Sequence, residues 1–226
     1  MNQNAMSTVC EIAFAAANAE SAGKFIRDLA VISEPVFLDH YSPAAGTAAD
    51  PYCQDGVAPA HLAMLGFSSP DAFERAARQP GFAAALGDQA NGVRACTLMR
   101  RIEHPVAGAP APGPLAARFS YVVRYHRPAQ DEELFVRHYI ETHPPLLARL
   151  PGIRNVLCYV PLSCNAASGF ADADYMLGNE VVFDHMDAFN AAMASPLRHE
   201  LRAHFRQFPP FSGSNTHYPM QRRRIV

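Results

Sequence analysis

The residues best suited to chemistry lie in the second half of the chain, on the apolar stripe of one predicted helix. Between residues 135 and 153, apolar side chains recur at steps of three, four and one, which places them on one helical face. The stripe consists of Val136, Tyr139, Ile140, His143, Leu146, Leu147 and Leu150. An imidazole titrates near working pH, so His143 is a candidate general acid or base. Tyr139 precedes it by one helical turn and can hydrogen-bond the same ligand.

Two prolines follow this histidine and predict a kink or restart of the helix at that point. Pro144 and Pro145 have no N–H, so the carbonyls of Ile140 and Glu141 lose their usual partners. This gives His143 two interpretations that are equally open. The imidazole either reaches a ligand as a catalytic group or satisfies one of the freed carbonyls as a structural group.

A neighbouring predicted strand supplies further phenols. Tyr121, Val123 and Tyr125 alternate along it and share one side, which lines the same space if that side faces the helix. Phe135 and Phe183 are further candidates for binding the ligand. The chemistry that these side chains suggest is proton abstraction next to a carbonyl, with a tyrosine hydroxyl stabilising the enolate oxygen. The ordinary role of such aromatic stripes is core packing, and this alternative is the more common one for the three tyrosines.

Composition limits the classes of function. The chain has 226 residues, 49% of them hydrophobic and 18% charged, with a net charge of −2. Such a chain offers no broad basic face, so we expect no nucleic-acid partner. It has no apolar run long enough to span a membrane and no convincing leader, and we expect no membrane partner. Five widely spaced cysteines without metal-ligand spacing predict a reduced, cytoplasmic protein with no metal and no other cofactor.

The pattern of elements divides the chain into two halves. Residues 105–117 are almost all Pro, Ala and Gly and are typical of a linker, which leaves an N-terminal unit at 6–104 and a C-terminal unit at 118–226. Each half shows the order strand, helix, strand, strand, helix, strand. The predicted strands are 9–15, 36–41, 61–67, 93–102, 119–126, 154–160, 176–183 and 216–225. The predicted helices between them are 20–31, 72–86 with an interruption at Pro80-Gly81, 132–150, and 186–194 followed after Ser195-Pro196 by a second piece to 208.

A fixed offset between the halves indicates an internal repeat. Asp71-Ala72-Phe73 and Asp187-Ala188-Phe189 are 116 positions apart (187 − 71), and the same offset relates Pro80 to Pro196. We therefore predict an α+β fold of two tandem ferredoxin-like βαββαβ units. Each unit leaves one sheet face uncovered, and the two sheets can bury these faces against each other as an intrachain α+β barrel.

The second half resembles the EthD family of the dimeric α+β-barrel superfamily. The resemblance is carried by Arg127-Pro128, Glu132-Glu133, Phe135, Tyr139, His143-Pro144-Pro145-Leu146 and Leu150-Pro151-Gly152-Ile153. Tyr139 stands where the family pattern often has tryptophan. The first half lacks the His-x-Pro-Leu motif, so a site of this type is expected in the second half alone. The resemblance implies a small protein that acts without a metal, and homodimerisation stays open.

These observations favour one function and leave two open. The favoured function is binding and cofactor-free acid/base conversion of a small hydrophobic carbonyl or aromatic compound, as a cyclase, isomerase or decarboxylase. The first alternative, implied by the superfamily, is an oxygen-dependent monooxygenase or a haem-interacting protein. The second is a non-catalytic small-ligand or stress-response module. For all of these functions except haem binding, the expected partner is a small hydrophobic molecule.

Overall fold

The computed structural model describes residues 6–15, 18–50, 58–87, 93–108, 115, 117–162 and 174–226. Of the predicted linker at 105–117, residues 109–114 and 116 lie outside the described residues. No helix in the described ranges is both long and apolar enough to cross a membrane.

The elements follow the predicted order, and the second helix of each half is divided into two shorter helices. The N-terminal half contains β1 (Met6–Phe14), α1 (Ala19–Ala30), β2 (Phe37–Pro43), β3 (His61–Phe67), α2 (Pro70–Ala77), α3 (Pro80–Gly87) and β4 (Val93–His104). The C-terminal half contains β5 (Phe119–His126), α4 (Glu132–Leu147), β6 (Ile153–Pro161), β7 (Tyr175–Phe183), α5 (Met186–Met193), α6 (Leu197–Phe205) and β8 (Asn215–Arg224).

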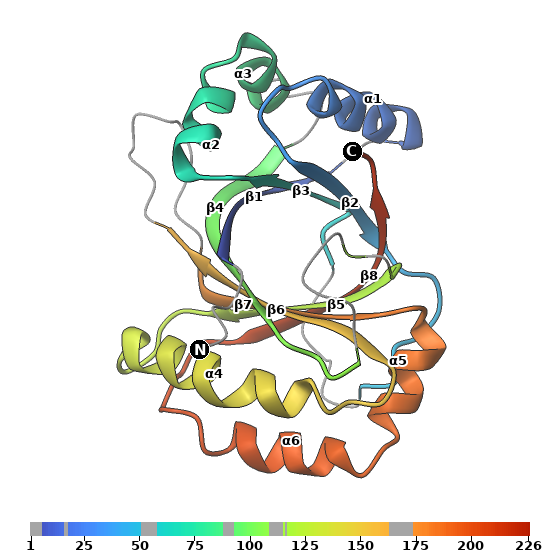
Figure 1. Ribbon diagram of the computed structural model, residues 1–226, viewed down its shortest axis with the longest axis vertical. Coiled ribbons are helices and arrows are strands. Elements are labelled where there is room, and N and C mark those ends of the chain that lie inside the picture. The colour runs from blue at the N-terminus through green and yellow to red at the C-terminus, as the bar shows by residue number, and fades with distance from the viewer. Residues whose placement is uncertain are drawn as a thin grey trace.

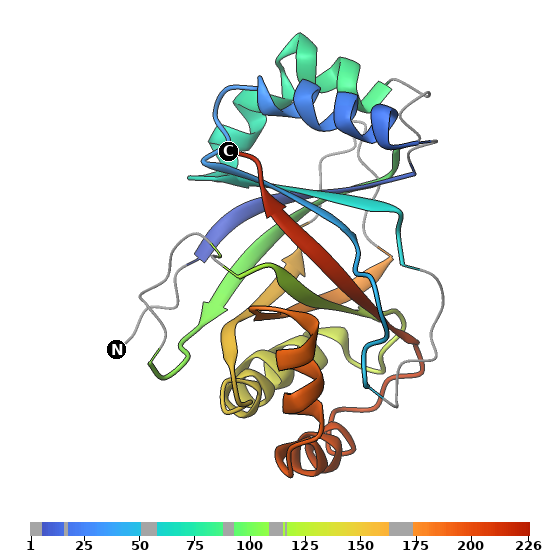
Figure 2. The same ribbon diagram turned by 90° about the vertical axis from the view of Figure 1, so that its right-hand side faces the viewer.

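Eight antiparallel strands close into one barrel within the single chain. Their order is β1-β3-β2-β8-β5-β7-β6-β4, so β2–β8 and β4–β6 are the two seams between the halves. Helices α1 to α3 cover one side of the barrel and α4 to α6 cover the other (Figures 1 and 2). The predicted α+β class and intrachain barrel are confirmed. The strand order β4-β1-β3-β2 in the first half matches β8-β5-β7-β6 in the second.

Side-chain caps start four of the helices. Asn18, Ser69 and Asp131 accept hydrogen bonds from backbone N–H groups in the first turns of α1, α2 and α4. His185 caps α5 in the same way, through its ring nitrogen. These caps satisfy N–H groups that have no partner within the helix.

The predicted break at His143 is wrong, because α4 runs through Pro144 and Pro145 to Leu147. Proline fixes φ near the helical value, so it removes hydrogen bonds without forbidding the backbone shape. The helix resumes its bonding at once, since the Ala148 N–H donates to the Pro144 carbonyl at 2.9 Å. Burial of Tyr139, His143 and Leu147 on one face stabilises the continuous helix.

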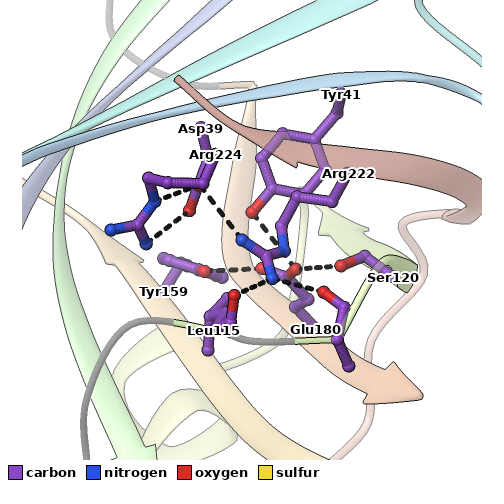
Figure 3. Close-up of polar contacts among 9 residues, drawn as sticks. Asp39, Tyr41, Leu115, Ser120, Tyr159, Glu180, Arg222 and Arg224 are labelled. Atoms are coloured by element: carbon purple, nitrogen blue, oxygen red, sulfur yellow. Dashed lines mark hydrogen bonds and ion pairs between the residues drawn. The ribbon is translucent and has the colours of Figure 1, made fainter. Parts of the chain in front are cut away.

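The barrel interior is unusually polar and ties the two halves together (Figure 3). Asp39 from β2 accepts hydrogen bonds from Arg222 at 3.0 Å and Arg224 at 2.6 Å, both from β8. Glu180 from β7 accepts hydroxyl hydrogen bonds from several strands. Its donors are Tyr41 (3.2 Å), Ser120 (2.5 Å) and Tyr159 (2.6 Å).

A second buried ion pair lies in the same interior. Arg124 from β5 donates to the Glu11 carboxylate from β1, and both side chains are almost fully buried. The Tyr175 hydroxyl donates to the same carboxylate at 3.1 Å. Because each charge has an opposite charge and further hydrogen bonds, the cost of burying it is offset.

The outer faces of the two sheets differ in how they are filled. In the N-terminal half, the space under α1 to α3 is packed with phenylalanine rings. These are Phe14, Phe25, Phe67, Phe73 and Phe82, all 4% exposed or less. The corresponding space under α4 to α6 contains a cavity, which is the candidate site.

Candidate active site between α4, α6 and the outer face of the barrel

The candidate site is a cavity of about 540 Å³ in the C-terminal half. Its floor is the outer face of β5, β7 and β8, and its other walls come from helices α4, α5 and α6. One charged side chain, Asp50, comes from the segment after β2 in the other half. The cavity therefore lies in one unit but is completed by both.

Strand β5 directs its phenols to this cavity. Tyr121, Val123 and Tyr125 line it, whereas the alternate residues Ser120, Val122 and Arg124 are buried inside the barrel. This is the period-two alternation of a strand whose two faces are both buried. The side of β5 that the sequence singles out does face α4.

Helix α4 brings Tyr139 and His143 to the cavity on successive turns. The centroids of the two rings are 5.0 Å apart, and the Tyr139 ring is 5.1 Å from that of Tyr125 on β5. All three residues line the cavity. The helix and the strand thus place the Tyr139 ring between the phenol of Tyr125 and the imidazole of His143.

The two phenols share a hydrogen bond, and burial is the main reason that the pKa of each lies above its usual value. Both phenols therefore remain protonated at neutral pH. A hydrogen bond between two hydroxyl groups uses one hydroxyl proton, so the other is available to a ligand oxygen.

His143 is paired with a histidine that the sequence did not single out. Its Nδ1 lies 3.0 Å from Nδ1 of His204 on α6, and the rings stack at a centroid distance of 5.2 Å. His143 is 7% exposed, and burial, followed by the charges of His204 and His138, lowers its pKa to about 3. The imidazole is therefore neutral at pH 7. The hydrogen-bond partner is this histidine rather than a freed carbonyl.

His138, which lies off the apolar stripe of α4, belongs to the same cluster. It is half-buried and stacks on His204 at a centroid distance of 6.0 Å. His138 and His143 are five apart on α4, and α6 brings His204 between them. The residue pattern of α4 could not predict this contact, because the contact depends on how α4 and α6 pack against each other.

Tyr121 marks the end of the cavity nearest the other half of the chain. Its hydroxyl donates to Asp50 Oδ2 at 2.8 Å, and its ring lies 5.6 Å from that of His217 on β8. The segment that carries Asp50 is held to α5, since the Ala49 N–H donates to Asn190 Oδ1 at 2.8 Å. Asp50 and His217 were not predicted, and no sequence signal within either half links them to Tyr121.

The two predicted phenylalanines lie outside the cavity lining. Phe135 is fully buried against Tyr125, Phe208 and Phe211. Phe183 is fully buried against Phe189, which itself lines the cavity. The structure brings the three tyrosines and His143 together and holds the two phenylalanines behind them.

Helix α6 contributes cations that sequence reasoning also missed. Arg198 and Arg202 are one turn apart, are half-buried and line the cavity. Their i, i+4 spacing is a visible signal, but it identifies a shared face without saying what that face covers. Within the described ranges, no group of three or more His, Cys, Asp or Glu side chains is arranged to hold a metal ion.

Comparison of whole structures gives full-length relatives of the fold. An anthrone oxidase-like protein aligns with a TM-score of 0.59 at 15% identity, covering 99% of this chain and 94% of that protein. A monooxygenase candidate from Lactobacillus acidophilus aligns at 0.54 with 10% identity, covering 97% and 94%. One from Fusobacterium nucleatum aligns at 0.53 with 8% identity, covering 98% and 93%. At these identities the likeness concerns the fold alone.

Comparison of the sequence adds a family match in the second half. A search of curated proteins finds no match. Residues 127–208 match the family model of the EthD domain. This range contains α4, α5 and α6, and with them His143, His204 and the two arginines of the cavity. The resemblance inferred from the His-x-Pro-Leu and Leu-Pro-Gly motifs is thereby confirmed for residues 127–208, the part of the chain that the family model matches.

Proposed function

We propose that the protein binds a small hydrophobic carbonyl or aromatic compound in this cavity and converts it by cofactor-free acid/base chemistry. The observation that carries the proposal is the convergence of His143, Tyr139 and Tyr125 on a space of about 540 Å³. A mostly apolar cavity with a few convergent polar groups is the usual form of a small-molecule site. The compound would be held by apolar contacts and oriented by the phenols.

In the proposed reaction, His143 takes a proton from a carbon next to the carbonyl of the ligand. Its neutral state at pH 7 leaves one ring nitrogen able to accept that proton. Donation of the Nδ1 hydrogen of His143 to His204 would leave Nε2 as the acceptor. The enolate formed in the cavity would stabilise the imidazolium, because opposite charges at short range favour the charged form.

The developing negative charge on the carbonyl oxygen would be met by the Tyr125 hydroxyl. In this arrangement Tyr125 would accept from Tyr139, with which it shares a hydrogen bond, and its own proton would be left for the ligand oxygen. Fixed donors of this kind stabilise an oxyanion more than a neutral carbonyl. Return of the proton from His143 to another carbon would complete an isomerisation. In a cyclisation, the enolate carbon would instead attack a second carbonyl carbon of the ligand, and His143 would give the proton to the alkoxide oxygen formed there.

The proposal is tested by following exchange of hydrogen for deuterium next to a carbonyl. In D₂O at pH 7, the protein should catalyse exchange at the acidic carbon of 2-tetralone, an aromatic ketone, as measured by proton NMR. His143→Gln should abolish the catalysed exchange. His199→Gln, on an exposed residue of α6 outside the cavity lining, is the control and should leave it unchanged. Equal catalysis by the His143→Gln variant would overturn the proposal.

A second candidate is oxygen-dependent oxidation, which is supported by the names of the full-length structural relatives. Removal of a proton from an activated carbon would be its first step as well, so the same His143 would be used. Oxygen uptake in the presence of anthrone would favour this alternative. Exchange without oxygen uptake favours the isomerase or cyclase type.

The haem alternative fits the histidine cluster poorly, and we derive no step through haem. A histidine that ligates a metal ordinarily donates its other ring N–H to a carboxylate, a backbone carbonyl or water, which strengthens the ligand. In His143 the nitrogen that would do so is paired with another imidazole. A haem absorbance band in the purified protein would overturn this assessment.

The third candidate is a non-catalytic ligand-binding or stress-response module. It predicts that compounds such as 2-tetralone bind without any catalysed exchange or oxygen uptake. Binding would then be lost on filling the cavity, for example with Val181→Phe, and kept in His143→Gln. The exchange experiment and a binding titration on the same variants separate this module from an enzyme.

We further propose that the chain arose as a tandem duplication of one ferredoxin-like unit, with units at 6–104 and 118–226 joined by a linker at 105–117. Helices α2 and α5 support this, because Pro70–Ala77 and Met186–Met193 are related by the offset of 116 residues. The shared strand order of the halves supports it as well. Homodimerisation stays a prediction and is tested by light scattering of the purified chain.

A further inference from the structure

Among the described residues that line the cavity, arginines outnumber carboxylates, and both arginines come from one helix. Arg198 and Arg202 of α6 and Asp50 of the other half are its arginine and aspartate side chains. With neutral His143, the two arginines outweigh the one carboxylate. A neutral hydrocarbon offers no hydrogen-bond acceptor to a guanidinium group, so two arginines in the lining indicate a ligand with a polar or anionic group.

The spacing of the two arginines suits one anionic group. Residues at i and i+4 of a helix are neighbours, with Cβ atoms about 6 Å apart. Both side chains line the same cavity, together with Leu201 and Phe205 of the same helix. Guanidinium groups match the planar geometry of a carboxylate and can bind it through paired hydrogen bonds.

The apolar part of the cavity lies on other elements. Val123 and Val181 come from the sheet, Leu147 from α4, and Phe189 and Met193 from α5. This division predicts a ligand with an apolar, ring-like body and an acidic group on the side that meets α6. The Asp50 carboxylate, which accepts from Tyr121, would repel an acid and attract a donor such as a ligand hydroxyl.

We propose that the ligand of this site is an aromatic carboxylic acid, whose carboxylate is bound by Arg198 and Arg202 while its ring lies over the floor of β5 and β7. This inference rests on the proposed function, since it assigns a substrate class to the same cavity. The arginines fix which way the ring enters. They thereby set which carbon of the ligand comes to His143.

The inference is tested with two probes of equal shape. Naphthalene-2-carboxylate and naphthalene-2-carboxamide differ in charge and hardly in size, and their binding to the full chain is measured by calorimetry at pH 7. The acid is expected to bind about tenfold or more tightly than the amide, as charge-assisted hydrogen bonds generally provide. The preference should fall as the salt concentration rises.

Variants assign the preference to the arginines. Arg198→Gln and Arg202→Gln, together in one variant, should lower the affinity for the acid to about that for the amide. Arg206→Gln is the matched control, because Arg206 is exposed at the end of the same helix and outside the cavity lining. Val181→Phe should abolish binding of both probes and so shows that they occupy the cavity.

The possible failures are distinguishable. Equal binding of the acid and the amide overturns the inference and leaves the proposed function standing. A preference for the acid that persists in the double variant overturns the assignment to these arginines. If neither probe binds, nor their phenyl and anthracenyl analogues, the proposed function fails and the inference fails with it.

Discussion

Nδ1 of His143 on α4 lies 3.0 Å from Nδ1 of His204 on α6, so the two imidazoles can share only one hydrogen. This contact joins the two helices that enclose the cavity. It also decides which nitrogen of His143 is left for a ligand. A substitution of either histidine therefore also changes the hydrogen bonding of the other.

Replacing the buried imidazole should separate chemistry from folding. We expect His143→Gln, which keeps hydrogen-bonding groups near His204, to abolish the catalysed exchange while the melting temperature stays within a few degrees. His143→Ala should also abolish it and should destabilise the protein more, because it enlarges a cavity. Melting is followed by circular dichroism. A collapse of folding in His143→Gln would instead support a structural role for the histidine.

The same histidine should make stability depend on pH. In the folded chain its pKa is lowered to about 3 from an ordinary 6.5, so below pH 6.5 the unfolded state binds a proton that the folded state does not. The stability that depends on a neutral His143 is fully present above about pH 6.5 and is lost as the pH falls toward 3. The loss at pH 5 is about 2 kcal/mol.

Urea unfolding at pH 7 and pH 5 measures this effect. The variant His143→Gln should lose distinctly less stability between these pH values than the unaltered protein. His40, whose pKa burial lowers to about 4, acts in the same direction and accounts for part of the remaining slope. Identical slopes for the variant and the unaltered protein would contradict the buried, neutral state of His143.

The two phenols should differ in their effect on catalysis. Tyr125→Phe removes the donor that faces a ligand oxygen and should lower the rate of exchange by about a hundredfold. Tyr139→Phe leaves that donor in place and removes only its support, so its effect should be several times smaller. Tyr218→Phe, on a residue of β8 outside the cavity lining, serves as the control. A reversed order would assign the oxyanion contact to Tyr139.

The buried ion pair between the halves should be strongly coupled. Arg124→Met leaves the Glu11 carboxylate in the barrel with only hydroxyl partners, and we expect a loss of about 3 kcal/mol in the free energy of unfolding. Adding Glu11→Gln should recover part of this loss. Denaturant unfolding of the two single variants and the double variant measures the coupling. Additive losses would show that the pair does not act as a unit.

An exposed pair provides the comparison for this cycle. Lys24 and Asp28 lie 2.7 Å apart on α1, with side chains 58% and 39% exposed. Lys24→Met should change the free energy of unfolding by no more than about 0.5 kcal/mol, because water and salt screen an exposed pair. The contrast tests whether burial, rather than charge pairing itself, makes the barrel interior sensitive.

Much of the local structure could be predicted from the sequence because it depends on local periodicity. Strand 61–67 has the bounds predicted for it, and the interruption at Pro80 separates α2 from α3. The stripe that contains Tyr139 and His143 is buried, and the predicted side of β5 faces α4. The predicted break at Pro144 failed because tertiary packing outweighed the loss of two backbone hydrogen bonds.

Spacing along the chain determined which side chains share a face, since helices and strands have fixed periods. It identified His143, Tyr139 and the β5 tyrosines, and it predicted a barrel from two similar halves. Only the tertiary structure decided what those faces meet: His204 against His143, Asp50 from the other half against Tyr121, and Arg198 and Arg202 in the cavity lining. These contacts join elements far apart in the sequence, and their partners are set by how helices and strands pack rather than by any local pattern.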